Sequence, residues 1–466
     1  MEAASYHATA CINCRRRGRK CDRTLPKCLS CEKRGVACEG YVTKWPGVAA
    51  RGKLAGRSIP VADGSVIIAG AHSKARQRQP NRDASMTPTT SSTVNHVPSD
   101  EVDKFVQYYI ADLSTIFFLG NGPSENPMFH YVLPLVDSVP PIRFALAGSA
   151  SCHIAAKTSD ELLEQKSLRL RLHATHLLRE MLQSPNAAID QTILASILML
   201  AQLDVRRTFV ISMRHVFGDC VEFQTHLKAA VAVIRNPCYD GSFNKYYFEQ
   251  RLAWLDVMSS TTSQSPPNLT IAEVKVIIGR FNVNGQRQWS YDVFPCPIDL
   301  FEIIIEATFL FKTPHLDLDQ VKSQAEDLGR RLYIWKCPTM SGPRKHMVEV
   351  WRLGIAAYLY RLFPDMTHRE LEEPLLDQVL GLAESISPAS SWSYALLWPI
   401  FQAVVTLGDG AQKEKDQIRS RLRIALETIG CRHHSNALDT LEIVWARSQE
   451  FDRFTISIPG RTIMLV

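Results

Sequence analysis

The sequence lacks the short motifs that mark the common enzyme classes. It contains no G-x-S-x-G nucleophile elbow, no H-E-x-x-H zinc protease motif, no P-loop and no dinucleotide-binding fingerprint. The glycine pair in "GNGPSENP" (120–127) is typical of a turn. These absences predict that the chain is not an enzyme and favour a binding function.

Membrane-spanning and secretory segments are also missing. The apolar run "TILASILMLAQL" (192–203) is short of the roughly 20 residues that a membrane span requires, and it predicts a buried helix instead. The N-terminus "MEAASYHATA" has neither the basic region nor the apolar stretch of a secretory signal. We therefore expect no membrane partner, and an oxidising compartment that would form disulfides is disfavoured.

Cysteine, in contrast, is abundant in one short segment. Six of the twelve cysteines lie within residues 11–38, in two copies of C-x2-C-x6-C that are displaced by 17 residues. The segment has too few apolar side chains to fold by burial alone, so a covalent or metallic link must hold it. The six cysteines are Cys11, Cys14, Cys21, Cys28, Cys31 and Cys38.

Three kinds of link are possible for these thiols: disulfides, a redox C-x-x-C pair, or zinc. A redox motif would accompany a βαβ pattern and would not need six thiols. Zinc takes tetrahedral thiolate ligands, and C-x2-C is its usual chelating spacing. Two zinc ions need eight ligand positions, which six thiolates supply if one from each half bridges both metals. The spacing thus predicts two zinc ions per chain.

Positive charge is concentrated in the same part of the chain. Residues 1–60 hold 13 lysines and arginines against four acidic residues, whereas the rest of the chain holds 40 against 43. Some of these cations neutralise the thiolates, but those of "RRRGRK" (15–20) repel one another unless a polyanion is close. This pattern indicates phosphate binding rather than a merely solvated face, and it predicts double-stranded DNA as a partner.

The cysteine pattern resembles that of the fungal zinc binuclear cluster transcription factors, and all six cysteines match. The resemblance implies that Cys11 and Cys28 are the bridging thiolates. It also implies that two adjacent basic residues, three and four positions after the second cysteine, reach the bases of a CGG triplet. Those positions hold Arg17 and Gly18 in this chain, so the second departs from the family pattern.

The basic residues around the cluster are the candidate DNA contacts. Residues 15–20 can form a short helix of one to two turns, and in the family such a helix docks in the major groove. Because Gly18 has no side chain to read a base, readout is expected from Arg17 together with Arg16 or Arg19. The expected phosphate contacts are Arg15, Lys20, Arg23 and Lys27.

The segment after the cluster, residues 46–97, is predicted to be a linker that is basic at first and then disordered. It is rich in Ser, Thr, Pro and Asn and shows no apolar periodicity. Many relatives carry a dimerising coiled coil here, but no heptad pattern is present in this chain. A homodimer is therefore expected to form through the region that follows, with a DNA-bound monomer as the alternative.

Residues 98–466 are predicted to form a large all-helical regulatory domain, which makes the fold class mainly α. Apolar residues recur at helical spacing in "SDEVDKFVQYYIADL" (99–113), over 170–181 and in "HMVEVWRLGIAAYLYRLF" (346–363). Five phrases in order, among them "NPMFHYVLPLVDS" and "LLWPIFQA", resemble the second type of fungal-specific transcription factor domain. The basic tail after the cluster also resembles the acriflavine sensitivity control type of regulators. "CRHHSN" (431–436) is interpreted as a solvent-facing stretch rather than a metal site.

Together these features predict three segments: a zinc cluster DNA-binding domain (8–45), the linker, and the regulatory domain. The predicted function is sequence-specific regulation of RNA polymerase II genes in a fungal nucleus, through CGG-like half-sites, as a pathway regulator of metabolism or drug response. The alternative is a receptor whose helical domain binds a small-molecule effector that controls DNA binding. An enzyme with an appended zinc module is a third, less favoured interpretation.

Overall fold

The computed structural model of the chain contains two compact units, Met1–Ser91 and Ser92–Val466. The predicted linker, 46–97, lies outside the described residues apart from Val97. The structure describes residues 11, 13, 14, 17–22, 28–36, 38, 97–116, 118, 119, 126–183, 190–206, 221–241, 246–280, 294–314, 316–340, 342–364, 375–446, 456, 463 and 465.

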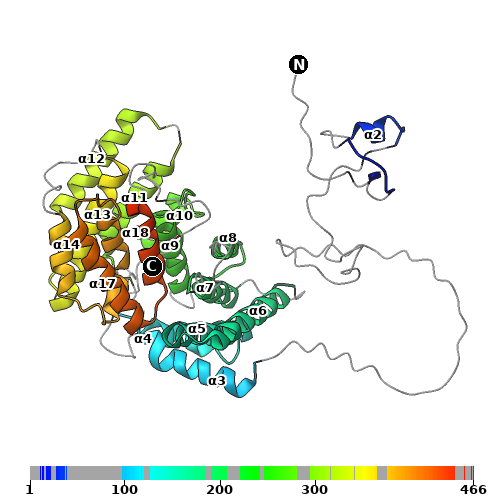
Figure 1. The fold of residues 1–466 in the computed structure, drawn as a ribbon, viewed down its shortest axis with the longest axis horizontal. Coiled ribbons are helices and arrows are strands. Elements are labelled where there is room, and N and C mark those ends of the chain that lie inside the picture. The colour runs from blue at the N-terminus through cyan, green and yellow to red at the C-terminus, as the bar shows by residue number, and fades with distance from the viewer. Residues whose placement is uncertain are drawn as a thin grey trace, which may run out of the picture. The chain divides into compact units, whose positions relative to one another are not determined.

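The first half of the helical unit runs from α3 to α8, and its helices lie together in Figure 1. Two of its segments, η1 and η3, are π-helical, and η4 is a 3-10 turn. Helix α5 is central, since it packs against α3, α6 and α7. The elements are α3 (Ser99–Tyr108), η1 (Tyr109–Leu113), α4 (Ser114–Ile116), η3 (Met128–Val132), η4 (Leu133–Leu135), α5 (Pro140–Thr158), α6 (Glu161–Gln183), α7 (Gln191–Arg206) and α8 (Val221–Ile234).

The second half contains the helices from α9 onward, and Figure 1 shows α12, α13 and α14 gathered at one end of this unit. Helix α13 is its centre, since it packs against α11, α12, α14 and α16. The helices are α9 (Tyr247–Ser260), α10 (Ile271–Ile278), α11 (Ile298–Lys312), α12 (Leu318–Ile334), α13 (Gly342–Leu362), α14 (Leu375–Glu384), α15 (Trp392–Ala395), α16 (Leu397–Val404), α17 (Gln412–Ile429) and α18 (His433–Ala446).

A stack of three buried tryptophans joins the helices of this second half. The ring of Trp351 on α13 lies 5.2 Å from that of Trp398 on α16, in parallel, and 5.7 Å from that of Trp254 on α9. Both indole N–H groups find acceptors, because Trp351 donates to a backbone carbonyl (3.0 Å) and Trp398 to the hydroxyl of Thr261 (2.8 Å). These rings therefore contribute both a large apolar area and a fixed orientation between helices.

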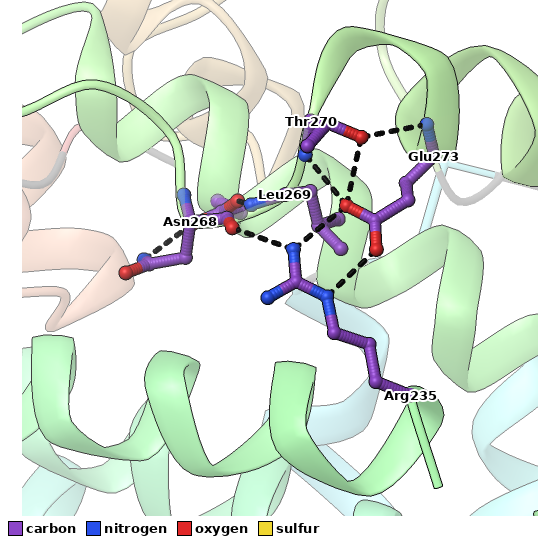
Figure 2. A network of polar contacts seen from close by, with 6 residues as sticks. Arg235, Asn268, Leu269, Thr270 and Glu273 are labelled. Carbon is purple, nitrogen blue, oxygen red and sulfur yellow. Dashed lines mark hydrogen bonds and ion pairs between the residues drawn. The ribbon is translucent and has the colours of Figure 1, made fainter. Parts of the chain in front are cut away.

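Helix α10 is held in place at its N-terminus by the polar network of Figure 2. Thr270 and Glu273 form a reciprocal capping box, and Arg235, just after α8, grips the Glu273 carboxylate with two bonds of 2.7 and 2.8 Å. Arg235 also donates to the carbonyl of Asn268 (3.1 Å). The Arg235 hydrogen bonds keep the pKa of Glu273 low, at about 2, so this contact persists to acidic pH.

The structure confirms the prediction of a mainly α-helical protein, and no strand occurs among the described residues. The three predicted helical stripes fall in α3 with η1, in α6 and in α13, and the apolar run 192–203 falls in the buried helix α7. No helix in the described part of the chain is long and apolar enough to cross a membrane.

The expectation that residues 431–436 face solvent is wrong. The side chains of His433 and His434 are only 3% and 1% exposed, because this turn packs under Tyr394, whose ring stacks on that of His433. Burial lowers the pKa of His434 to about 4, so the ring is neutral. Within the described residues, neither histidine belongs to a group of side chains close enough to share a metal.

Candidate metal centre and nucleic-acid interface

The six cysteines of the N-terminal unit converge on one small volume. Four of them are buried, with at most 1% of their surface exposed, and Cys21 and Cys38 are partly exposed. The Cys21 and Cys28 sulfurs are 3.4 Å apart, and those of Cys11 and Cys31 are 3.7 Å apart. The sequence repeat therefore brings its thiols together, although the halves are separated along the chain.

The sulfurs form two sets in which all members lie within 4.8 Å of one another. The sets are Cys11, Cys14, Cys21 and Cys28, and Cys11, Cys31 and Cys38. Four thiols make a complete tetrahedral site for zinc, and soft thiolates are among its preferred donors. Cys11 belongs to both sets, as a bridging ligand would. Cys28 belongs to the first set only, although its N–H donates to the Cys38 sulfur (3.5 Å) of the second.

The two halves of the module repeat each other in geometry as well as in sequence. The N–H of Cys11 donates to the Cys21 sulfur (3.4 Å), and 17 residues later the N–H of Cys28 donates to the Cys38 sulfur in the same way. Likewise, Arg19 donates its N–H to the Cys14 carbonyl, and the corresponding pair in the second half makes the same bond. The module is thus an internal duplicate around a shared thiol cluster.

Gly18, the residue that departs from the family pattern, ends the helical turn of the first half. Its φ is +62°, and Gly35, the equivalent residue of the second half, has the same value. Only glycine adopts this left-handed conformation without strain, so Gly18 serves as a helix C-terminal cap. A Cβ placed on Gly18 would meet no atom within 4 Å, which means that backbone conformation and not space favours glycine here.

Two polar residues that the sequence did not single out hold the halves together. Asp22 accepts hydrogen bonds from the N–H groups of Leu29 (3.0 Å) and Ser30, and so caps α2 (Leu29–Glu32). Arg34 donates to the Lys20 carbonyl (3.2 Å), which fixes the end of the basic stretch. The only sequence signal for Arg34 was its position, 17 residues after Arg17.

Burial sets the acidity of the thiols. It raises the pKa of Cys11 well above its usual value and that of Cys31 to about 12. Burial acts in the same direction at Cys28, but hydrogen bonds from the Cys21 side chain and the Cys31 backbone outweigh it and lower the pKa to about 7. Zinc must displace these protons to bind, so the affinity of the cluster for zinc falls as the pH falls.

The candidate DNA contacts are only partly within view. Arg17, Arg19 and Lys20 are exposed to solvent directly after the second cysteine. Helical backbone is described at residues 13 and 14 and the turn closes at Gly18, so Arg19 and Lys20 follow the helical turn and do not lie on it, as the sequence had suggested. The other predicted contacts, Arg15, Arg16, Arg23 and Lys27, lie outside the described residues.

Comparison with known families agrees with both units. Residues 9–45 match the fungal Zn(2)-Cys(6) binuclear cluster domain, and residues 104–455 match the fungal specific transcription factor domain. No curated protein and no solved structure matches the chain closely enough to be compared with it. The fold and the thiol cluster therefore define a zinc-binding, DNA-binding regulator of transcription. The chain belongs to the family of proteins with the fungal specific transcription factor domain.

Proposed function

We propose that the thiol cluster holds two zinc ions per chain, with Cys11 and Cys28 as the bridging ligands. Six thiolates can complete two tetrahedral sites only if two of them are shared. The position of Cys11 in both sulfur sets supports its share of this role, and the bond from the Cys28 N–H to the Cys38 sulfur brings Cys28 next to the second set. The DNA-binding domain would then span residues 8–45 and the regulatory domain 98–466.

We further propose that the protein acts in the nucleus as a sequence-specific regulator of RNA polymerase II genes, through CGG-like half-sites. The observation that carries this proposal is the exposed basic stretch beside the cluster, where Arg17 ends the helical turn and is free to enter a groove. Regulation of a metabolic or drug-response pathway is the role that the resemblance to acriflavine sensitivity control regulators suggests.

The reading residue and the positioning residues are expected to respond differently to substitution. Arg17→Ala should cost about 1–3 kcal/mol on the preferred site and relax the preference at one base pair, because a bidentate contact to guanine is lost. Lys20→Ala should weaken binding to all sequences alike and reduce the salt slope by about one, because one phosphate contact is lost. Selection of bound sites from random DNA, followed by salt titration, measures both effects.

If both variants lower affinity uniformly, Arg17 is a phosphate contact and readout lies elsewhere. Arg423→Gln on α17 is a suitable control, since this exposed arginine belongs to the helical unit and its loss should leave both the site preference and the salt slope unchanged.

Homodimerisation is proposed to occur through the helical unit, because one cluster reads too few base pairs to find its site in a genome. A fragment of residues 1–97 should then sediment as a monomer and bind half-sites weakly, whatever their spacing. The full chain should sediment as a dimer on DNA that carries two half-sites. A full chain that stays monomeric on the paired site contradicts this proposal and supports binding as a monomer.

A further inference from the structure

A pocket in the helical unit is lined on one side by aromatic rings. Its apolar wall includes Tyr109 from η1, Phe118, and Tyr247, the first residue of α9. The Tyr247 ring is itself fixed, since it stacks on Tyr131 at 5.1 Å with an angle of only 22° between the planes. A flat apolar group that enters the pocket would therefore meet rigid aromatic surfaces.

The polar side of the pocket consists of hydrogen-bond donors. Arg251 lies one turn after Tyr247 on α9, and Gln202 faces it from the neighbouring helix α7. Both side chains are half-buried, and neither forms a hydrogen bond or ion pair with another residue that the structure describes. The Tyr247 hydroxyl has only the weak acceptor Met128 Sδ at 4.0 Å. Three donors thus point to a common space without a strong acceptor among the described residues.

No acidic residue is found among the described residues that line this pocket, so the Arg251 charge has no counterpart there. The pocket also lies at the N-terminal end of α9, where the helix dipole favours negative charge. Asn126 adds a further donor: its carboxamide oxygen accepts from the Met128 N–H (3.0 Å), while its nitrogen donates to the Ser114 carbonyl (3.2 Å) and keeps a second hydrogen. The electrostatics therefore favour an anion.

The backbone around the pocket is irregular in a way that is frequent at binding sites. Both η1, which supplies Tyr109, and η3, which begins at Met128, are π-helical. Such turns insert an additional residue into a helix and redirect side chains, and they occur often at functional sites. Two of them on one pocket, from segments that are separated along the chain, place the aromatic wall opposite the donors.

We propose that this pocket binds a small monocarboxylate with a flat apolar body, whose carboxylate pairs with Arg251 while its body lies against Tyr109, Phe118 and Tyr247. This inference goes beyond DNA binding, because it assigns the helical unit an effector site and a ligand class. It gives the receptor interpretation of the sequence a location that the sequence could not provide.

Thermal unfolding of the full chain without DNA tests the proposal. Sodium benzoate should raise the melting temperature of the helical unit by about 2 °C or more at saturation. Benzamide has the same ring without the charge, and inorganic phosphate has charge without the ring, so neither should produce this shift. Arg251→Gln should abolish the benzoate shift, whereas Arg179→Gln, an exposed arginine on α6, should retain it in full.

A benzoate shift that is absent from the wild-type chain, or equal in Arg251→Gln, overturns the proposal. An equal shift with phosphate also overturns it, since the site would then select charge alone. Should Arg251→Gln fail to fold, Gln202→Met decides: it keeps the side-chain volume, removes a donor, and should weaken benzoate binding several-fold. Because no DNA is present, a negative result leaves the proposed DNA-binding function intact.

Discussion

Chelation of zinc is expected to unfold the N-terminal module and to abolish specific DNA binding, while the helical unit stays folded. The only fully buried side chains in the described part of the module are Cys11, Cys14, Cys28 and Cys31, with Val36 packed against them. Once the metal is removed, these thiols are left without an apolar core to hold the chain. Structural zinc contributes about 10–16 kcal/mol in comparable small modules, so its loss exceeds any other stabilising term.

Metal counting on the isolated residues 1–60 checks the arrangement of the cluster. The wild-type fragment should bind two zinc ions, and a value near one contradicts the bridged cluster. Cys11→Ala and Cys28→Ala should disturb both sites, because each removes a proposed shared ligand. Cys38→Ala should mainly release one ion, since Cys38 belongs to a single sulfur set. Equal losses in all three variants would show that no thiol is shared.

Acid should release the metal by a related route. The pKa of Cys31 is raised to about 12 by burial in the metal-free state, so this thiol holds its proton firmly and zinc must compete for the site. Cys28, with its pKa near 7, is the readiest to ionise at neutral pH. The first metal contact is therefore expected at Cys28.

The thiol cluster could be predicted from the sequence because ligand spacing is a local property. The C-x2-C-x6-C repeat places its thiols through short turns, so position along the chain nearly determines position in space. The role of Gly18 could not be predicted in the same way. Its lack of a side chain suggested a lost base contact, whereas the structure shows a left-handed cap that is repeated at Gly35. Backbone conformation at a single residue is not encoded in the motif.

In the helical unit, the sequence predicted helices but not their neighbours. Periodicity identifies the buried face of a helix such as α13, yet it does not say which helix covers that face. The burial of His433 and His434 depends on Tyr394, about 40 residues away, and no local pattern reports that contact. The carboxylate pocket is a further case, because Gln202 and Arg251 meet only once α7 and α9 are packed.

Replacement of Gly354 by alanine is expected to destabilise the helical unit strongly. Gly354 lies on α13 where α16 crosses it, and a Cβ there would fall 2.4 Å from the Pro399 Cβ and 2.5 Å from the Pro399 Cα. The proline ring and backbone cannot rotate away, so the two helices must separate. That separation would also pull apart the parallel rings of Trp351 and Trp398, one turn from the contact.

The expected cost of Gly354→Ala is at the upper end of the about 1–3 kcal/mol that overpacking usually takes. Gly329→Ala on α12 is the matched control, because a Cβ on that buried glycine would meet nothing within 4 Å. There the higher helix propensity of alanine should stabilise the chain by about 0.5–1 kcal/mol. Denaturant unfolding followed by the helical signal should thus move in opposite directions for the two variants. A shared direction would mean that α13 and α16 do not approach each other through Gly354, and that the tryptophan stack alone determines their spacing.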